Sequence, residues 1–445
     1  MRNAKLFAGT SHLALAQRVA AHLGVELAPV NLRRYTNRET TVDLGCSVRE
    51  KDVYILQSGS TTTNDHLMEV LIMVSAAKLA SARKITVVVP YFPYSKQSKK
   101  KKRRGAISGK LVANMVTVAG ADHIITMDLH ASQMSGFFTI PVDNLFSEPT
   151  IGRWIIENIA KGSGQKESGL AGGPKDIVVV AKNAGGAKRV TALADRLGTS
   201  FALIHTDNAP TTRPFSRTPS TVALHTLPQT PRGPGIPILA AEQHPDPEEL
   251  LIEGVATPPS GLEITEVLNR SDDDDDDDID EGNLMEMVNT PLDELTSPTD
   301  ASVAHNAQAI AQAPPVAVTS WHKKRNARIT LVGDVRNKLV LLLDDMIDQP
   351  SSFLTAAEHL MVHCGARAVY IVAAHGLFSG SSLGEVEICP YVQKVIVTNT
   401  FPIPEELTSA STKLIQIDVA PVLAEAIRRN HNGESISYLF DRNPW

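Results

Sequence analysis

The feature that most constrains the fold is a series of short, almost wholly apolar runs separated by stretches with helical patterning. Such runs lack the polar alternation of a half-exposed strand and are typical of parallel sheets that helices cover on both faces. About 325 residues of this pattern are too many for one doubly wound sheet and do not form eight even barrel repeats. We therefore expect an α/β fold of two domains, with sites beyond the carboxyl ends of the strands. The expected strands are 53–57, 85–89, 123–127, 177–180, 339–343, 369–372 and 395–397, and the expected helices are 65–81, 108–118, 150–159, 187–197, 352–363 and 421–429.

The segment 207–326 interrupts this pattern with a different composition. It holds 15 of the 27 prolines, only two aromatic residues, and 21 Asp+Glu against 7 Lys+Arg, with an unbroken acidic run at Asp272–Asp278. Such a chain cannot bury enough apolar surface to offset the entropy of ordering, so we expect a disordered acidic insertion. Two stretches, 248–268 and 284–295, mix apolar and acidic residues and could fold as helices on a partner.

The formal net charge of −6 is therefore a sum of two unlike parts, about −14 in the insertion and about +8 in the rest. The basic remainder suits anionic ligands. The three cysteines, Cys46, Cys364 and Cys389, have no CxxC spacing, which argues against a disulfide framework or zinc site. We expect a cytoplasmic protein with no membrane segment, because neither a run of about 18 apolar residues nor a secretory leader is present. We also expect no nucleic-acid partner.

The clearest chemistry follows the strand at 339–343. Two acids, Asp344 and Asp345, end that run, and a short loop leads to a helix expected to begin at Ser352. Acids at a strand end can hold the vicinal hydroxyls of a ribose, and a helix N-terminus offers unpaired N–H groups to its phosphate. The alternative is that the two acids only cap a loop.

Three further segments follow strands and leave alternatives open. Asp128 and His130, two residues apart, could share a side and bind Mg²⁺ or a phosphate, although a lone histidine is more often structural. The six bases Lys99–Arg104 could bind polyphosphate, act as a nuclear-localisation signal, or form a solvated loop. The glycines within Lys182–Arg189 could let backbone approach a phosphate, but a strand-to-helix turn needs glycines in any case.

Together and in this order, these segments resemble the ribose-phosphate pyrophosphokinase (phosphoribosyl pyrophosphate synthetase) family. The resemblance covers nearly the whole chain outside the insertion and includes KLFAGTSH, NRET, NDHLMEVLIM, DLHASQ with GFF, GGAKRVTALADRLG, LLLDDMID, VTNT and EAIRRNHNGESISYLF. It implies two phosphoribosyltransferase-type domains and a Mg²⁺-dependent transfer of pyrophosphate from ATP to ribose 5-phosphate. The implied domains are 1–147, then 148–206 with 327–429, and a tail at 430–445 that packs back on the first domain.

The resemblance also implies roles for individual residues. The nucleotide would contact Tyr35, Asn37, Glu39, Lys96 and Gln97; the catalytic His130 would also touch the metal together with Asp128 and Asp143; and the ribose phosphate would contact Asp344, Asp345, Asp348, Ser351 and Ser352.

Several positions depart from the family pattern, and they fall on the implied site. Each lost charge-matched contact would cost about 2–4 kcal/mol of transition-state stabilisation. In the ATP loop, Lys96 stands where the family has Arg and Lys101 where it has Asp. Elsewhere, Asn183 replaces a metal-linked acid and Thr139 replaces an Asp of the metal signature. Two loops also differ: His205–Asn208 replaces the family's His-Lys-x-Arg, and Gln349–Ser352 replaces its Thr-small-Gly-Thr.

Two hypotheses follow. The chain is either an active ribose-phosphate diphosphokinase or a non-catalytic regulatory or scaffolding subunit that assembles with paralogous subunits, and the eroded site favours the second. The resemblance is to the divergent, insertion-bearing subunits of fungi. A third, weaker hypothesis makes 207–326 a docking tether for signalling or cytoskeletal partners, with Ser216 and Thr296–Pro298 as phosphorylation sites; the alternative is an inert spacer.

Overall fold

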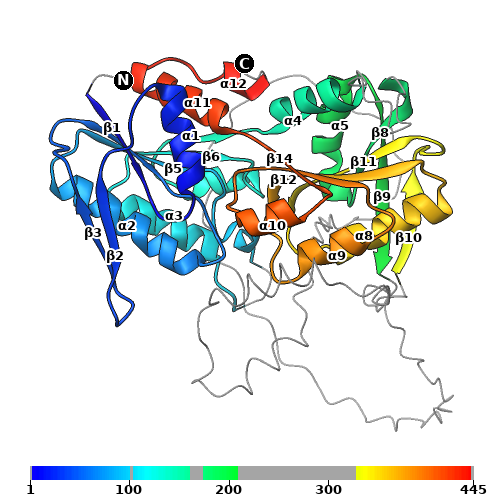
Figure 1. Cartoon of the computed structure of the whole chain (residues 1–445), viewed down its shortest axis with the longest axis horizontal. Helices are drawn as coiled ribbons and strands as arrows, with labels where there is room; N and C mark the ends of the chain where they lie inside the picture. The colour runs from blue at the N-terminus through cyan, green and yellow to red at the C-terminus, as the bar shows by residue number, and fades with distance from the viewer. Residues whose placement is uncertain (1–2, 101–103, 161–173, 209–326, 442–445) are drawn as a thin grey trace, which may run out of the picture. The chain divides into compact units, whose positions relative to one another are not determined.

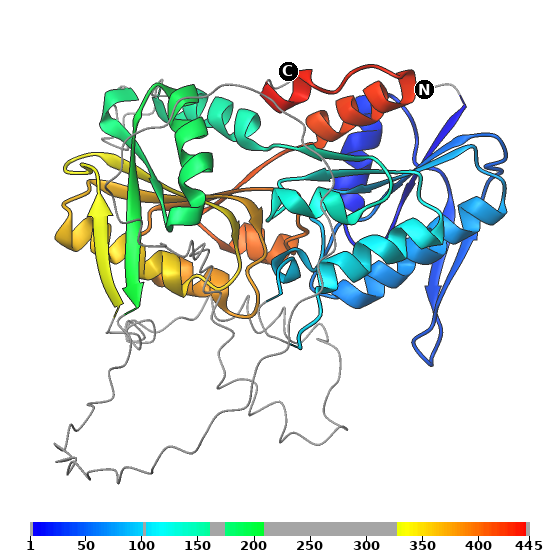
Figure 2. The same ribbon diagram turned by 180° about the vertical axis from the view of Figure 1, so that it is seen from behind.

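Two parallel sheets, each covered by helices on both faces, organise the chain (Figures 1 and 2). The structure is a computed structural model that describes residues 3–100, 104–160, 174–208 and 327–441. The sequence predicted this two-sheet α/β fold, and the structure confirms it.

The first sheet has five strands in the order β1-β4-β5-β6-β7, all parallel. Successive strand residues point to opposite faces, so Val53 and Ile55 of β4 enter one core while Tyr54 and Leu56 enter the other. Helices α2 and α3 cover the first of these faces, and α1 covers the second. The bounds are β1 Ala4–Ala8, α1 Leu13–Leu23, β4 Asp52–Leu56, α2 Thr63–Leu79, β5 Lys84–Val89, α3 Ser108–Ala119, β6 His123–Met127 and β7 Val142–Leu145.

The second sheet has seven strands in the order β10-β9-β8-β11-β12-β13-β14. All neighbours are parallel except β9 and β10. Helices α8, α9 and α10 contribute to the core on one face, and α4 and α5 to the core on the other. The bounds are α4 Glu148–Ile155, β8 Ile177–Ala181, α5 Ala187–Leu197, β9 Ser200–Asn208, β10 Ala327–Val332, β11 Leu339–Ile347, α8 Ser351–Glu358, β12 Ala368–Gly376, α9 Ser382–Ile388, β13 Lys394–Thr398, α10 Glu405–Ala410 and β14 Leu414–Ile417.

Strands β9 and β10 bracket the acidic segment, and sequence patterning did not predict their pairing. They run antiparallel, and Asn208 is the direct ladder partner of Ala327. The chain therefore leaves the sheet and returns to it at neighbouring positions, as at the turn of a hairpin. The expected insertion began at 207, but β9 continues to Asn208, and residues 209–326 with their expected helices and phosphorylation sites lie outside the described residues.

The C-terminal helix α11, Ala420–Asn432, belongs to the first sheet rather than the second. Its buried face, which includes Val422 and Leu423, packs in the same core as Leu15 and Val19 of α1. His431 and Arg83 both contact the buried carboxylate of Asp52, at 3.0 Å and 2.5 Å. Apolar residues from Val419 onward thus pack in a core of the first sheet, ahead of the domain boundary expected at 429. The short helix α12, Tyr438–Asp441, follows.

A separate antiparallel hairpin, β2 Val30–Arg34 with β3 Thr40–Leu44, extends from the first-sheet region (Figure 1). Arg34 at its outer end pairs with Asp65 in the first turn of α2 at 2.9 Å. Within the described ranges, no helix combines the length and apolar character needed to cross a membrane.

Candidate active site

A pocket of about 580 Å³ brings together segments of both sheet regions. Its volume is within the range of small-molecule sites. Lys96, Gln97 and Asp348, three of the predicted site residues, line it. The complete lining is Thr61, Thr62, Thr63, Asn64, Asp65, Tyr91, Tyr94, Ser95, Lys96, Gln97, Asp348 and Leu377.

Local backbone geometry places these side chains. Tyr94 has a positive φ of 58° and precedes a short 3₁₀ turn, Ser95–Gln97. Its hydroxyl donates a hydrogen bond to the side-chain oxygen of Asn64 at the start of α2. Lys96 Nζ lies 3.9 Å from Asp348 Oδ2, across the pocket. Thr62, the residue before α2, makes no side-chain capping bond, and the start of this 17-residue helix lines the pocket. Hydroxyls, a helix N-terminus and a lysine suit an anionic ligand.

Asp344 and Asp345 lie inside a strand, not at its end. The sequence predicted a strand of five residues, but β11 runs for nine, to Ile347, because its pairing with β12 continues beyond the acids. Both acids are buried, at 9% and 4% exposed. Lys182 Nζ lies 2.8 Å from Asp344 Oδ2, and Arg189 lies 3.6 Å from Asp344 and 3.7 Å from Asp345.

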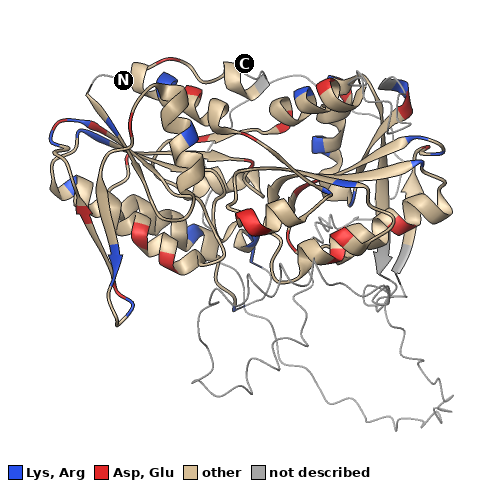
Figure 3. Cartoon of the chain, viewed as in Figure 1, with Lys and Arg blue, Asp and Glu red and all other residues tan. Residues whose placement is uncertain are grey.

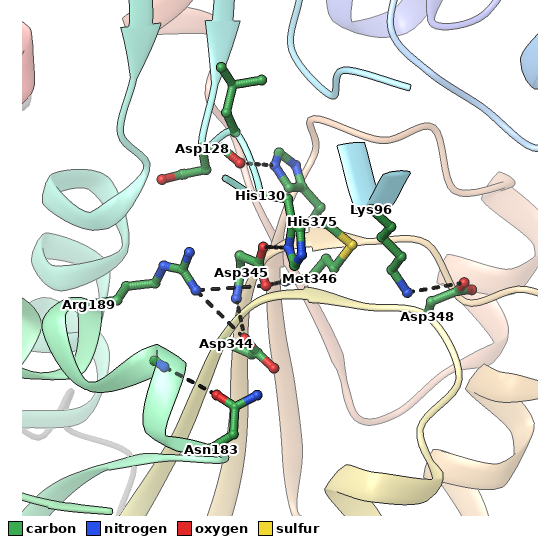
Figure 4. Close-up of polar contacts among 12 residues, drawn as sticks. Lys96, Asp128, His130, Asn183, Arg189, Asp344, Asp345, Met346, Asp348 and His375 are labelled. Atoms are coloured by element: carbon green, nitrogen blue, oxygen red, sulfur yellow. Dashed lines mark hydrogen bonds and ion pairs between the residues drawn. The ribbon is translucent and has the colours of Figure 1, made fainter. Parts of the chain in front are cut away.

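His130 joins this group from the other sheet region (Figure 4). Its Nδ1 is 2.5 Å from Asp345 Oδ2. Burial alone would raise the pKa of Asp345, but the bond with His130 and the charge of Arg189 hold it well below its usual value. Burial raises the pKa of Asp344, and Lys182 opposes that rise. The structure thus unites three of the predicted residues, one catalytic and two ribose-binding.

Asp128 does not share a side with His130 on a strand, as its spacing suggested. Strand β6 ends at Met127, Asp128 has a φ of 43°, and its Oδ2 accepts a hydrogen bond from the Ser147 N–H at 2.8 Å. Its carbonyl oxygen lies 3.1 Å from Nε2 of His375, a residue 1% exposed (Figure 4). Left-handed backbone at a non-glycine residue costs about 1–3 kcal/mol and needs such support.

Sequence reasoning missed His375 and the pairing of Lys182 and Arg189 with the acids. His375 Nδ1 also lies 2.8 Å from the hydroxyl of Thr400, a buried residue of the VTNT motif. The one available signal was that the bases in Lys182–Arg189 follow a strand, as the two acids follow another. That segment was interpreted through its glycines instead.

Asp143, predicted in the metal set, is not placed beside the others. It lies on β7, and its Oδ2 is 2.7 Å from Nε2 of His123. His123 begins β6, whereas His130 follows the far end of that strand. The structure does not bring Asp143 into contact with Asp128 or His130, since ladder pairing places it opposite Ile125 in mid-strand, and its metal role stays a prediction.

The remaining sugar-phosphate residues lie around α8. Asp348 accepts a bond from the Ser379 N–H at 3.1 Å, which fixes the loop after β11. Helix α8 begins at Ser351, one residue earlier than expected, and Ser351 and Ser352 are exposed in its first turn. Pro350 precedes them and supplies no N–H. Asn183, which replaces a family acid, uses its Oδ1 to accept from the Gly186 N–H at 3.2 Å.

The three predicted adenine contacts lie on the β2–β3 hairpin and outside the pocket lining. Tyr35 is 58% exposed, and its N–H donates to the Glu39 carbonyl at 2.9 Å. Asn37 Oδ1 accepts from the Glu39 N–H at 3.2 Å. The hairpin turn is thus ordered by its own bonds, and these three residues are exposed.

Lys and Arg, like Asp and Glu, are distributed over both sheet regions in the view of Figure 3. Three of the six bases of Lys99–Arg104 lie outside the described residues, as does the departure at Lys101. A polyphosphate role for that run therefore stays a prediction.

The arrangement of the acids does not fit a resident divalent cation. Asp344 and Asp345 are paired with bases, Asp143 with His123, and Asp128 with a backbone N–H. Among the residues that the structure describes, no group of three or more His, Cys, Asp or Glu could hold a metal ion. A Mg²⁺ site needs several free oxygen ligands, and here the carboxylates are already engaged.

Comparisons with known proteins agree with the resemblance. A family model described as the N-terminal domain of ribose phosphate pyrophosphokinase matches residues 4–120, and a phosphoribosyl synthetase-associated domain matches 274–441. The chain is 44% identical to Ribose-phosphate pyrophosphokinase 1 of Saccharomyces cerevisiae, covering 99% of both chains, and 41% identical to Ribose-phosphate pyrophosphokinase 1 of Schizosaccharomyces pombe, covering 99% of this chain and 100% of that one. A crystal structure of phosphoribosylpyrophosphate synthetase from Mycobacterium smegmatis matches with a TM-score of 0.64 at 27% identity, covering 97% of this chain and 100% of the other. With relatives this similar along its full length, the chain belongs to the ribose-phosphate pyrophosphokinase family.

Proposed function

We propose that the chain is a subunit of ribose-phosphate diphosphokinase whose own catalysis is impaired. The reaction transfers pyrophosphate from ATP to the anomeric hydroxyl of ribose 5-phosphate, so catalysis consists mostly of positioning and of neutralising developing charge. One observation carries the proposal: Asp344 and Asp345 are bonded within the chain, while the pocket lined by Lys96 and Gln97 remains open.

The open pocket supports nucleotide binding. Gln97 can bond an adenine edge or a ribose, and Lys96 together with the start of α2 can bind phosphate oxygens. On the sugar side, the exposed first turn of α8 at Ser351 and Ser352 can accept the 5-phosphate, although Pro350 leaves one N–H fewer there.

The hairpin residues Tyr35, Asn37 and Glu39 support assembly with other subunits. They are exposed and outside this chain's own pocket. If they contact adenine, as the family resemblance implies, they do so in the pocket of a neighbouring homologous subunit. We therefore propose that the chain works within a homo- or hetero-oligomer of paralogues.

The test is the release of AMP that depends on ribose 5-phosphate, measured with Mg²⁺ and phosphate. The full chain is assayed alone, with a paralogue that keeps all family motifs, and as the variant Gln97→Ala, with Lys338→Ala outside the pocket lining as the control. We expect background turnover alone, co-purification with the paralogue, and turnover of the complex above that of the paralogue by itself.

Turnover of the isolated chain within about tenfold of the paralogue would contradict impaired catalysis. Failure to co-purify would contradict the subunit role. A complex whose increased turnover is untouched by Gln97→Ala would favour the alternative, a purely scaffolding subunit.

A further inference from the structure

The ammonium group of Lys182 occupies a fixed position beside Asp344. Lys182 directly follows β8, and its Nζ lies 2.8 Å from Asp344 Oδ2. It also lies 4.3 Å from the ring centre of Phe353, a buried residue of α8. An ammonium held between a carboxylate and an aromatic face has two favourable contacts and little freedom to leave.

The charges around Asp344 balance without any ion from solution. Asp344 and Asp345 contribute two carboxylates, and Lys182 and Arg189 contribute two positive charges within 4 Å of them, while His130 bonds Asp345 as well. Buried carboxylates need such partners, because an unpaired charge in this setting is costly. A divalent cation added to this group would carry an uncompensated charge and would have to displace Lys182.

Lys182 supplies a positive charge where the buried carboxylate of Asp344 needs one. Its side chain reaches from the end of β8 to the acid of β11 and to the first turns of α8, the three segments that would surround a bound pentose phosphate. The neighbouring residue Asn183 replaces an acid in the family pattern. Its side-chain oxygen accepts a hydrogen bond from the Gly186 N–H. The segment thus loses a possible metal ligand and gains a cation at adjacent positions.

We propose that Lys182 is a built-in cation that replaces a divalent metal at Asp344, so that this part of the site is assembled, and binds a pentose phosphate, without a divalent ion. The binding part of this statement rests on the proposed function. The replacement of the metal by Lys182 does not.

The first experiment measures the thermal unfolding midpoint of the full chain in EDTA and in excess Mg²⁺. We compare the wild type, Lys182→Met, the charge-preserving Lys182→Arg, and Lys338→Met, which removes a half-buried lysine that pairs with the exposed Asp334. We expect Mg²⁺ to raise the midpoint of Lys182→Met by about 3 °C or more relative to the others, since a ligand stabilises the state it binds. Ions bound by the run Asp272–Asp278 affect all four proteins equally and cancel in the comparison.

An equal response of all four proteins to Mg²⁺ would overturn the proposal. So would a response of the wild type that Asp344→Asn abolishes, because the metal would then bind Asp344 despite Lys182. This second comparison does not use Lys182→Met and decides the question even if that variant fails to fold.

The second experiment measures ribose 5-phosphate binding by calorimetry in the same two buffers. We expect wild-type dissociation constants within about twofold of each other, and a Lys182→Met protein that binds at least about tenfold more tightly with Mg²⁺ than with EDTA. A wild type that needs Mg²⁺ would contradict the proposal. A wild type that binds the sugar phosphate in neither buffer would contradict the proposed function, while the unfolding data would still decide the role of Lys182.

Discussion

The two sheet regions have equally regular cores but differ in what surrounds their ligand-binding residues. In the first region, Lys96 and Gln97 line an open pocket at the start of α2. In the second, Asp344 and Asp345 are buried and paired with Lys182, Arg189 and His130. The same kind of fold thus presents one set of polar groups to a ligand and engages the other set internally.

This difference teaches that a core and the site it supports are constrained separately. Apolar burial in β8 and β11 depends only on the shape and hydrophobicity of their residues. The charge of the site depends on a few residues that the core does not need, such as Lys182 and Asn183. A chain can therefore keep the family fold while its site takes on another electrostatic arrangement.

The contact between the regions gives the prediction with the largest effect. His375 is buried and bonds Thr400 at 2.8 Å and the carbonyl of Asp128 at 3.1 Å. His375→Ala leaves a cavity and unpaired polar atoms, so we expect the free energy of unfolding to fall by about 3 kcal/mol in urea titrations. The exposed His363→Ala should change it by less than about 0.5 kcal/mol. Equal losses in both variants would show that His375 does not couple the regions.

The paired acid Asp345 gives a pH dependence of the second region. Its folded pKa is below the usual value, so its contribution to stability is complete above pH of about 4 and is lost as the pH falls further. Asp345→Asn should therefore lower the free energy of unfolding by about 1–3 kcal/mol near pH 6 and by progressively less toward pH 3. Glu157, whose exposed carboxylate pairs with Arg153, provides the control. The difference between Glu157→Gln and the wild type should show no such trend with pH. A constant difference at every pH would contradict the pairing.

Most of the fold could be predicted from the sequence, because buried parallel strands have a pattern that needs no knowledge of their partners. The run at 339–343 identified β11, for example, but not its true length. The acids that follow are as polar as loop residues, and only their pairing with β12 and the bases keeps them in the strand. The pairing of β9 with β10 was missed for a related reason, since the long segment between them hides a hairpin.

The site was harder to predict, because its residues were chosen by type and order rather than by what they contact. Asp143 and Asp128 have the right chemistry for a metal, yet one bonds His123 and the other a backbone N–H. A sequence shows that a carboxylate is present but not whether another group has already engaged it. That depends on contacts such as Lys182 with Asp344, which join different strands.

A second contact between the regions should respond to mild acid. His12 Nε2 lies 2.8 Å from the Asn399 carbonyl, and burial lowers the pKa of His12 below its usual value. Its contribution to stability is therefore present above pH of about 6.5 and is lost as the pH falls below it. His12→Gln should reduce the loss of unfolding free energy between pH 7.5 and 5.5 by about 1 kcal/mol. The exposed His22→Gln provides the control, and an unchanged pH profile of His12→Gln would contradict a neutral buried histidine.

The smallest effect tests the open pocket beside Lys96 and Gln97 directly. Gln97 lines that pocket and Asp345 does not, so the two should affect nucleotide binding differently. Loss of one hydrogen-bonding amide costs about 1 kcal/mol, and we expect Gln97→Ala to weaken ATP binding about fivefold by calorimetry. Asp345→Asn should leave the dissociation constant within about twofold, because its carboxylate faces His130 rather than the pocket. The reverse result, with ATP binding sensitive to Asp345 and indifferent to Gln97, would mean that the nucleotide binds among the paired acids and that the two regions do not divide the ligands as their contacts indicate.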